Sequence, residues 1–144
     1  MQVHLATHGT RHSVPSVLLK RTALEAMRAI GCSRDAELDV ALVSDATIAR
    51  LNRRFLHHVG PTDVLTFPGR TGPDDLTIGE VVISMDRART QAREAKWLVR
   101  REVALLLVHG VLHLGGFDDH TPRAALRMRA LERTILGRIF RSER

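Results

Sequence analysis

Two histidines, His109 and His113, are four residues apart in an apolar stretch that a pair of glycines follows. Residues i and i+4 lie on the same side of a helix, so both imidazoles could bind one metal ion. Gly115 and Gly116 would end this helix and let the chain turn back with a third ligand. A single histidine more often satisfies a hydrogen bond in the core, but two in register, with Asp and His behind them, favour a metal site.

The number of ligands predicts what the metal would do. With two histidines and one carboxylate or third histidine, a divalent ion keeps an open position, which is typical of catalytic sites where a bound water becomes a nucleophile. Zinc peptidases that share the two-histidine helix carry a glutamate base directly after the first histidine, where this chain has Gly110. Glycine cannot transfer a proton, so the sequence argues against a peptidase.

The helix that must carry these histidines is predicted from Val99 to Leu114 and is apolar nearly all round its C-terminal half. Such a helix is buried on several sides, so we expect it to form the centre of the hydrophobic core. Glu102 precedes His109 by about two helical turns and therefore lies near the same side. It could hold a ligating imidazole through a hydrogen bond, or it could be an ordinary charge at a helix start.

The remaining elements follow from hydrophobic periodicity and turn residues. Further helices are predicted over about 16–30, 45–55 and 86–95 and from Pro122 onward, and strands over about 1–7, 37–43, 62–68 and 76–84. At 144 residues the chain is long enough for one domain with a substantial core, residues 1–144, and too short for two.

The charge of the chain predicts a polyanionic partner. The net charge is +6, the pI is about 11.1, and the cations are almost all arginine, whose planar fork fits phosphate oxygens. The base composition of a genome can favour Arg over Lys, but it does not explain the net excess, so nucleic acid is the leading candidate. Arg50, Arg53 and Arg54 form the first dense basic surface on a predicted helix. With only four Phe, one Trp and no Tyr, we expect contacts to the backbone rather than base stacking.

Neither a membrane segment nor a disulfide is expected. The longest apolar run, Val103 to Val108, is far shorter than the roughly 20 residues that span a bilayer, and the N-terminus lacks the basic-then-apolar order of a signal peptide. We therefore expect a cytoplasmic protein with no membrane partner. The single cysteine, Cys32, leaves histidine and carboxylate as the ligands for any metal.

Four motifs occur in a fixed order along the chain. They are Leu51-Asn52 with Phe55 downstream, Pro61 to Pro68 (PTDVLTFP), Gly79 to Ser84 (GEVVIS) and His109 to Asp118 (HGVLHLGGFD). In this order they resemble the bacterial YbeY-type endoribonucleases, also called rRNA maturation factors. The resemblance covers most of the chain beyond about residue 35.

The resemblance implies both a fold and a function. The expected fold is a single α+β domain, with a small mixed sheet of about four strands packed with about five helices and a central buried helix that carries the metal ligands. The expected function is zinc-dependent cleavage of single-stranded RNA, with one Zn²⁺ per chain, during maturation of the small-subunit rRNA 3′ end and ribosome quality control. RNA and the small ribosomal subunit are the implied partners, and the oligomeric state is not predicted.

A second function fits the same charge and family. The chain could be a ribosome assembly factor that holds a structural zinc and cleaves little RNA by itself. Structural zinc sites usually close with four protein ligands, whereas catalytic sites keep three. The apparent count of three therefore favours the enzyme, and a count of four would favour the assembly factor.

The chain departs from the family pattern at the third metal ligand. The family spaces its ligands as His, three residues, His, five residues, His, and this spacing arrives at Asp119, with His120 one place later. Oxygen and nitrogen both suit zinc, so both residues stay candidates, with a slight preference for Asp119. His109 and His113 are the other candidate ligands and, with Asp118, the predicted catalytic residues. Asp118 or an unbound Asp119 is the nearest candidate for the general base.

The second departure is Leu56, where many family members carry an arginine suited to a phosphate. A substitute is expected close by in the sequence. The candidates for RNA contact are Arg50, Arg53, Arg54, His57 and His58.

Overall fold

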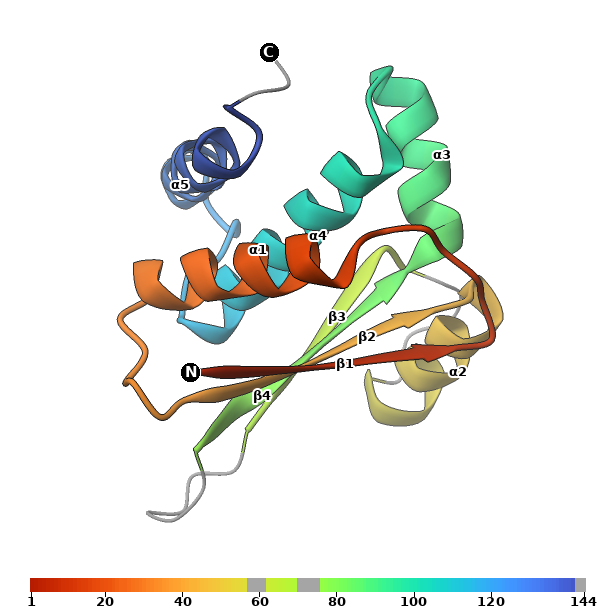
Figure 1. The fold of residues 1–144 in the computed structure, drawn as a ribbon, viewed down its shortest axis with the longest axis horizontal. Coiled ribbons are helices and arrows are strands. Elements are labelled where there is room, and N and C mark those ends of the chain that lie inside the picture. Colours follow the sequence, from red (N-terminus) through yellow and green to blue (C-terminus); the bar gives the residue numbers. More distant parts are fainter. Residues whose placement is uncertain (57–61, 70–75, 142–144) are drawn as a thin grey trace.

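The computed structural model describes residues 1–56, 62–69 and 76–141, and Figure 1 shows how their elements are arranged. Its strands are β1 (Gln2–His8), β2 (Glu37–Val43), β3 (Val64–Pro68) and β4 (Thr77–Ser84). Its helices are α1 (Ser16–Ala29), α2 (Asp45–Leu56), α3 (Met85–Ala95), α4 (Val99–Leu114) and α5 (Pro122–Ile139).

The four strands form one mixed sheet in the order β1-β2-β4-β3. The first three pair in parallel, with Leu5 opposite Val40 and Val40 opposite Val81, while β3 runs antiparallel to β4. Alternate residues of a strand point to opposite faces, so β2 buries Leu38, Val40 and Leu42 on one face and Ala41 and Val43 on the other. This two-sided burial is the reason why β2 is an interior strand.

The two faces of the sheet are covered unequally. Helices α1, α3, α4 and α5 lie on one side, and α2 lies alone on the other, where it covers Ala41, Val43, Leu65 and Val82 (Figure 1). Helix α4 contacts α1, α3, α5, β3 and β4, and its side chains at Val103, Leu107, Val108 and Leu112 are fully buried. The expected central position of this helix follows from its apolar circumference.

Helix α4 approaches the sheet closely at Gly110, the residue after the first histidine. A Cβ atom placed there would lie 2.6 Å from Cγ1 of Val81 and 3.4 Å from Cγ2 of Thr66. Only a residue without a side chain lets the helix axis come this near. The glycine therefore sets the distance between the helix that carries the histidines and the strands β3 and β4.

The expected fold class is confirmed. Over the described residues, five helices pack with a mixed sheet of four strands, and the predicted boundaries of the helices and strands differ from the observed ones by a few residues at most. Between the two helices predicted over about 86–95 and from Val99, Lys96 adopts a left-handed conformation with φ of 61° and ends α3. Among the described helices, none is long and apolar enough to cross a membrane.

Substitution of the glycine tests this close approach. We expect Gly110→Ala to lower the free energy of unfolding by about 1 kcal/mol, because overpacking costs about 1–3 kcal/mol and exceeds the gain of about 1 kcal/mol from helix propensity. Val81→Ala makes room for the new methyl group, so in that background the same change should stabilise the protein. Urea unfolding of the four proteins measures both effects, and an equal effect in both backgrounds would show that Val81 does not limit the approach.

Candidate metal centre

The two predicted histidines face each other on the last turns of α4. Their Nε2 atoms are 3.0 Å apart, and the rings meet edge to face with centroids separated by 4.6 Å. Asp119, in the turn after α4, completes a group in which one ligand atom from each residue lies within 4.8 Å of the others. Two imidazole nitrogens and a carboxylate oxygen are ligands that zinc accepts, so the residues present fit a divalent ion.

A carboxylate from α5 fixes the orientation of the first histidine. Glu132 is only 8 % exposed, and its Oε1 lies 2.7 Å from Nδ1 of His109. Because Nδ1–H donates to this carboxylate, the lone pair of His109 is on Nε2, which faces the other members of the group. Contacts of this kind orient ligating histidines and raise their basicity.

Glu132 is not among the site residues predicted from the sequence, although the sequence carries a signal for it. The residue lies on the inward stripe of α5, between Met128 and Ile135, whose other members are apolar. A glutamate in such a stripe is rarely buried without a partner. That signal marks a buried acidic residue, but it does not identify His109 as the partner.

The two histidines differ in their electrostatic surroundings. Burial lowers the pKa of His109, but the hydrogen bond and charge of Glu132, together with the charges of Asp119 and Asp63, outweigh it and raise this pKa above its ordinary value. Burial and the charge of His109 lower the pKa of His113, and Asp119 offsets them only in part. His113 therefore offers a free nitrogen more readily, while protons compete more strongly with a metal at His109.

The turn after α4 distinguishes the two candidates for the third ligand. Asp119 belongs to the group of three, and among the described residues that group does not include His120. The charge of His120 still lowers the pKa of His113, so its side chain is not far away. Asp118 uses its Oδ1 to accept a hydrogen bond from the backbone N–H of His120 at 3.0 Å, and this bond shapes the turn that carries Asp119.

The hydrogen bond of Glu102 shows whether this residue holds a ligating imidazole, one of the two roles considered for it. Its Oε1 accepts a hydrogen bond from Nε1 of Trp97 at 2.9 Å, while the partner of His109 is Glu132. Burial raises the pKa of Glu102, the bond from Trp97 lowers it, and the charge of Asp63 raises it. Glu102 therefore fixes the turn between α3 and α4 and does not hold a ligating imidazole.

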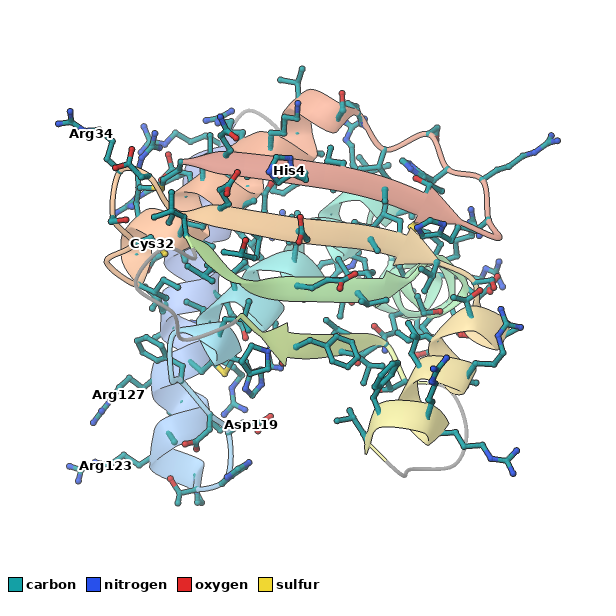
Figure 2. All side chains as sticks on the ribbon, turned by 90° about the horizontal axis from the view of Figure 1, so that it is seen from below. His4, Cys32, Arg34, Asp119, Arg123 and Arg127 are labelled. Atoms are coloured by element: carbon teal, nitrogen blue, oxygen red, sulfur yellow. The ribbon has the colours of Figure 1, made fainter. Side chains whose placement is uncertain are left out.

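The predicted RNA contacts lie on the other side of the sheet. Arg50, Arg53 and Arg54 line a hollow of about 620 Å³ along α2, together with Thr47 and Leu51. His57 and His58 lie outside the described residues. Figure 2 shows α2 beside the start of β3 and Asp119 beside α5, near the end of the same strand. The structure therefore places the arginines of α2 and the histidines of α4 on opposite faces of the sheet.

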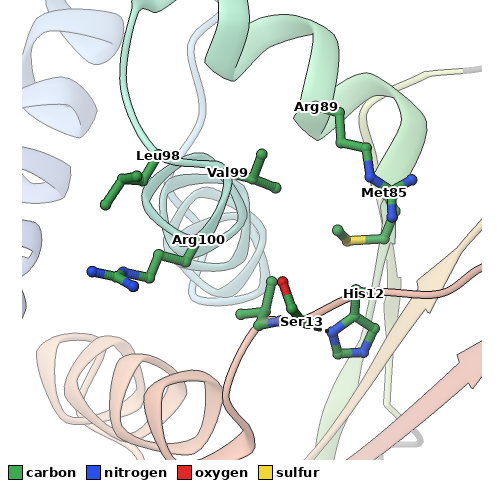
Figure 3. A pocket seen from close by; sticks show the side chains of 8 residues that line it. His12, Ser13, Met85, Arg89, Leu98, Val99 and Arg100 are labelled. Atoms are coloured by element: carbon green, nitrogen blue, oxygen red, sulfur yellow. Dashed lines mark hydrogen bonds between the residues drawn. The ribbon is translucent and has the colours of Figure 1, made fainter.

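A separate cavity of about 320 Å³ lies at the other end of α4 from the metal centre (Figure 3). His12, Arg89, Leu98 and Arg100 are among its lining residues. The ring of His12 is already engaged, because Nδ1 accepts from the N–H of Val14 at 3.1 Å and Nε2 lies 3.2 Å from Oγ1 of Thr7. None of the predicted site residues lies in this cavity.

The chain is similar in sequence to a family of known proteins. The family described as Endoribonuclease YbeY matches residues 4–139. A protein named Endoribonuclease YbeY from Pelotomaculum thermopropionicum is 41% identical over 128 residues, which cover 85% of this chain and 84% of the relative. One of the same name from Geobacter metallireducens is 34% identical over 143 residues, which cover 95% of both chains.

The fold also resembles a solved structure. The solution structure of a Thermotoga maritima protein superposes with a TM-score of 0.63 at 25% identity, covering 96% of this chain and 90% of that one. The family match spans nearly the whole chain, including the helix with both histidines and the turn after it. The chain therefore belongs to the endoribonuclease YbeY family.

Proposed function

We propose that this chain is an endoribonuclease that cleaves single-stranded RNA with the help of one zinc ion bound by His109, His113 and Asp119. The observation that carries the proposal is the convergence of these three side chains, with Glu132 behind His109. The names of the relatives and the net charge of +6 support an RNA substrate.

Each residue of the centre has a separate task in this proposal. An ion bound here would acidify a water molecule and polarise a phosphoryl oxygen. Glu132 keeps the Nε2 lone pair of His109 directed at the site, and His113 supplies the nitrogen that is more easily deprotonated. Asp118 stays the candidate general base, and it also holds the turn that presents Asp119.

The number of donors favours catalysis over a structural role. Three side chains of the described residues converge, and a structural zinc usually has four protein ligands. Asp119 is also exposed, so this side of the site is open to solvent. A ribosome assembly factor with a structural zinc is therefore the second candidate.

The biological setting is part of the same proposal. We infer that the substrate is rRNA, with processing at the 3′ end of the small-subunit rRNA, and that the protein acts in ribosome quality control on the small subunit in the cytoplasm. Arginines on α2 support contact with a phosphate backbone. A smaller hollow of about 230 Å³ is lined by Asp118 and Arg127, and the guanidinium of Arg127 could contact a phosphate there.

The first prediction concerns the metal. Treatment with a chelator should reduce cleavage of single-stranded RNA to the background rate, and added Zn²⁺ should restore it, because the nucleophile depends on the ion. Gel analysis of a labelled RNA measures this, and circular dichroism shows that the fold is retained. Cleavage that survives complete removal of zinc would contradict the mechanism.

The second prediction identifies the third ligand. We expect Asp119→Ala to weaken zinc binding by more than the roughly 10–100-fold that loss of an outer partner costs, because it removes a direct ligand. His120→Ala is the matched control, and it should retain one zinc per chain. Competition with a chromophoric chelator measures both affinities. Normal affinity in Asp119→Ala together with loss in His120→Ala would assign the ligand to His120.

The third prediction concerns the buried carboxylate behind His109. Glu132→Gln should lower zinc affinity by about 10–100-fold, because an uncharged oxygen holds the imidazole less firmly and makes it less basic. Glu102→Gln changes another buried carboxylate, one that accepts a hydrogen bond from Trp97 instead, and should leave zinc affinity unchanged. Equal effects of the two substitutions would mean that they act through stability alone.

A further inference from the structure

Two phenylalanine rings meet on the side of the sheet that carries α2. Phe55, at the end of α2, and Phe67, on β3, have ring centroids 5.8 Å apart and an interplanar angle of 79°. The guanidinium of Arg54 lies 5.3 Å from the centroid of Phe55. Two aromatic rings and the guanidinium of Arg54 are therefore in contact at one place on the surface.

Phe55 contributes little to the hydrophobic core. Phe67 packs against the small cluster under α2, which includes Ile48, Leu65 and Val82, whereas Phe55 is 53 % exposed. Single exposed apolar residues are common in proteins. Phe55 differs from these in two ways. Its ring is held by the contact with Phe67, and it directly follows Arg54, which lines the hollow along α2.

A single strand, β3, separates the ring of Phe67 from helix α4, which carries the two histidines. Thr66 points toward α4 and lies near Gly110, the residue after His109, while the next residue, Phe67, points to the opposite face. Strand β3 is at the edge of the sheet, so no further strand separates its two sides. A flexible polymer can pass around this edge from the arginines of α2 to the metal centre.

We propose that Phe55, held in place by the edge-to-face contact with Phe67, forms a stacking platform for one unpaired base of the RNA strand that is cleaved at the metal centre. The inference rests on the proposed nuclease function and adds a base contact to it. Proteins that bind single strands combine a basic groove with aromatic rings on which bases stack, and Arg54 with Phe55 offers both groups side by side. A base inside a duplex cannot reach such a platform, so the contact selects unpaired RNA.

The stacking platform differs from the expectation, based on the low aromatic content, that the protein contacts only the RNA backbone. Four phenylalanines in the whole chain argued against base stacking, yet two of the four meet in one partly exposed pair. Stacking depends on where the rings lie rather than on how many there are.

The test uses the unaltered protein first. A single-stranded RNA carries one fluorescent 2-aminopurine flanked by abasic nucleotides, and a chelator prevents cleavage. The fluorescent base is moved along the strand in a set of such RNAs. We expect binding to quench its fluorescence at one position, because only a protein ring can stack on it there.

Variants then assign the quenching to Phe55. We expect Phe55→Leu to abolish quenching and weaken binding of ordinary single-stranded RNA by about 5-fold to 100-fold, while Phe55→Trp retains both. Binding of a fully abasic strand should not change. Arg54→Ala should instead weaken binding of every strand and make its salt dependence shallower. Val17→Ala, at an exposed apolar residue on α1, is the control that changes neither.

The outcomes separate this inference from the proposed function. The stacking platform would be overturned if no position of the fluorescent base were quenched, or if Phe55→Leu weakened binding of abasic and ordinary RNA equally. In either case, cleavage by the unaltered protein would still support the nuclease function. An unaltered protein that neither binds nor cleaves RNA would overturn both. The exposed position of Phe55 predicts that both Phe55 variants keep an unfolding midpoint close to that of the unaltered protein, which thermal unfolding checks.

Discussion

The structure depends on one constraint: helix α4 is buried on nearly all sides and still has to present two imidazoles. Val108 and Leu112, which directly precede the two histidines in sequence, are fully buried, so the orientation of the helix is fixed by the core. A polar ring next to such a core is stable only when its nitrogens have partners. Glu132 supplies one, and the convergence of His109, His113 and Asp119 directs the others at a common point.

The sequence allowed prediction of the parts that depend on local spacing. The interval between His109 and His113 and the glycine pair after them predict a helix with both imidazoles on one side and a turn after it, and the structure shows this helix, the facing imidazoles and the turn. Glu132 could not be assigned as the partner, because that contact depends on how α5 crosses α4. The contact of Glu102 with Trp97 likewise depends on the geometry of the turn between α3 and α4.

Spacing along the chain was less informative for the RNA surface. Arg50, Arg53 and Arg54 were predicted together and do share one hollow. Their position relative to the metal centre could not be predicted, since it depends on β3 being an edge strand and on α2 lying alone on its side of the sheet. The pairing of Phe55 with Phe67 joins a helix to a strand and was equally out of reach.

The order of the strands has a consequence for how the chain folds. Antiparallel β3 and β4 are close in sequence, whereas each parallel contact, such as Leu5 with Val40 or Val40 with Val81, joins residues separated by at least one whole helix. Contacts between distant parts of the chain form slowly, because the loop entropy is lost before the contact is gained. We therefore expect β3 and β4 to pair early and both parallel pairings to form later, so that the rate-limiting step of folding lies in closing the parallel half of the sheet.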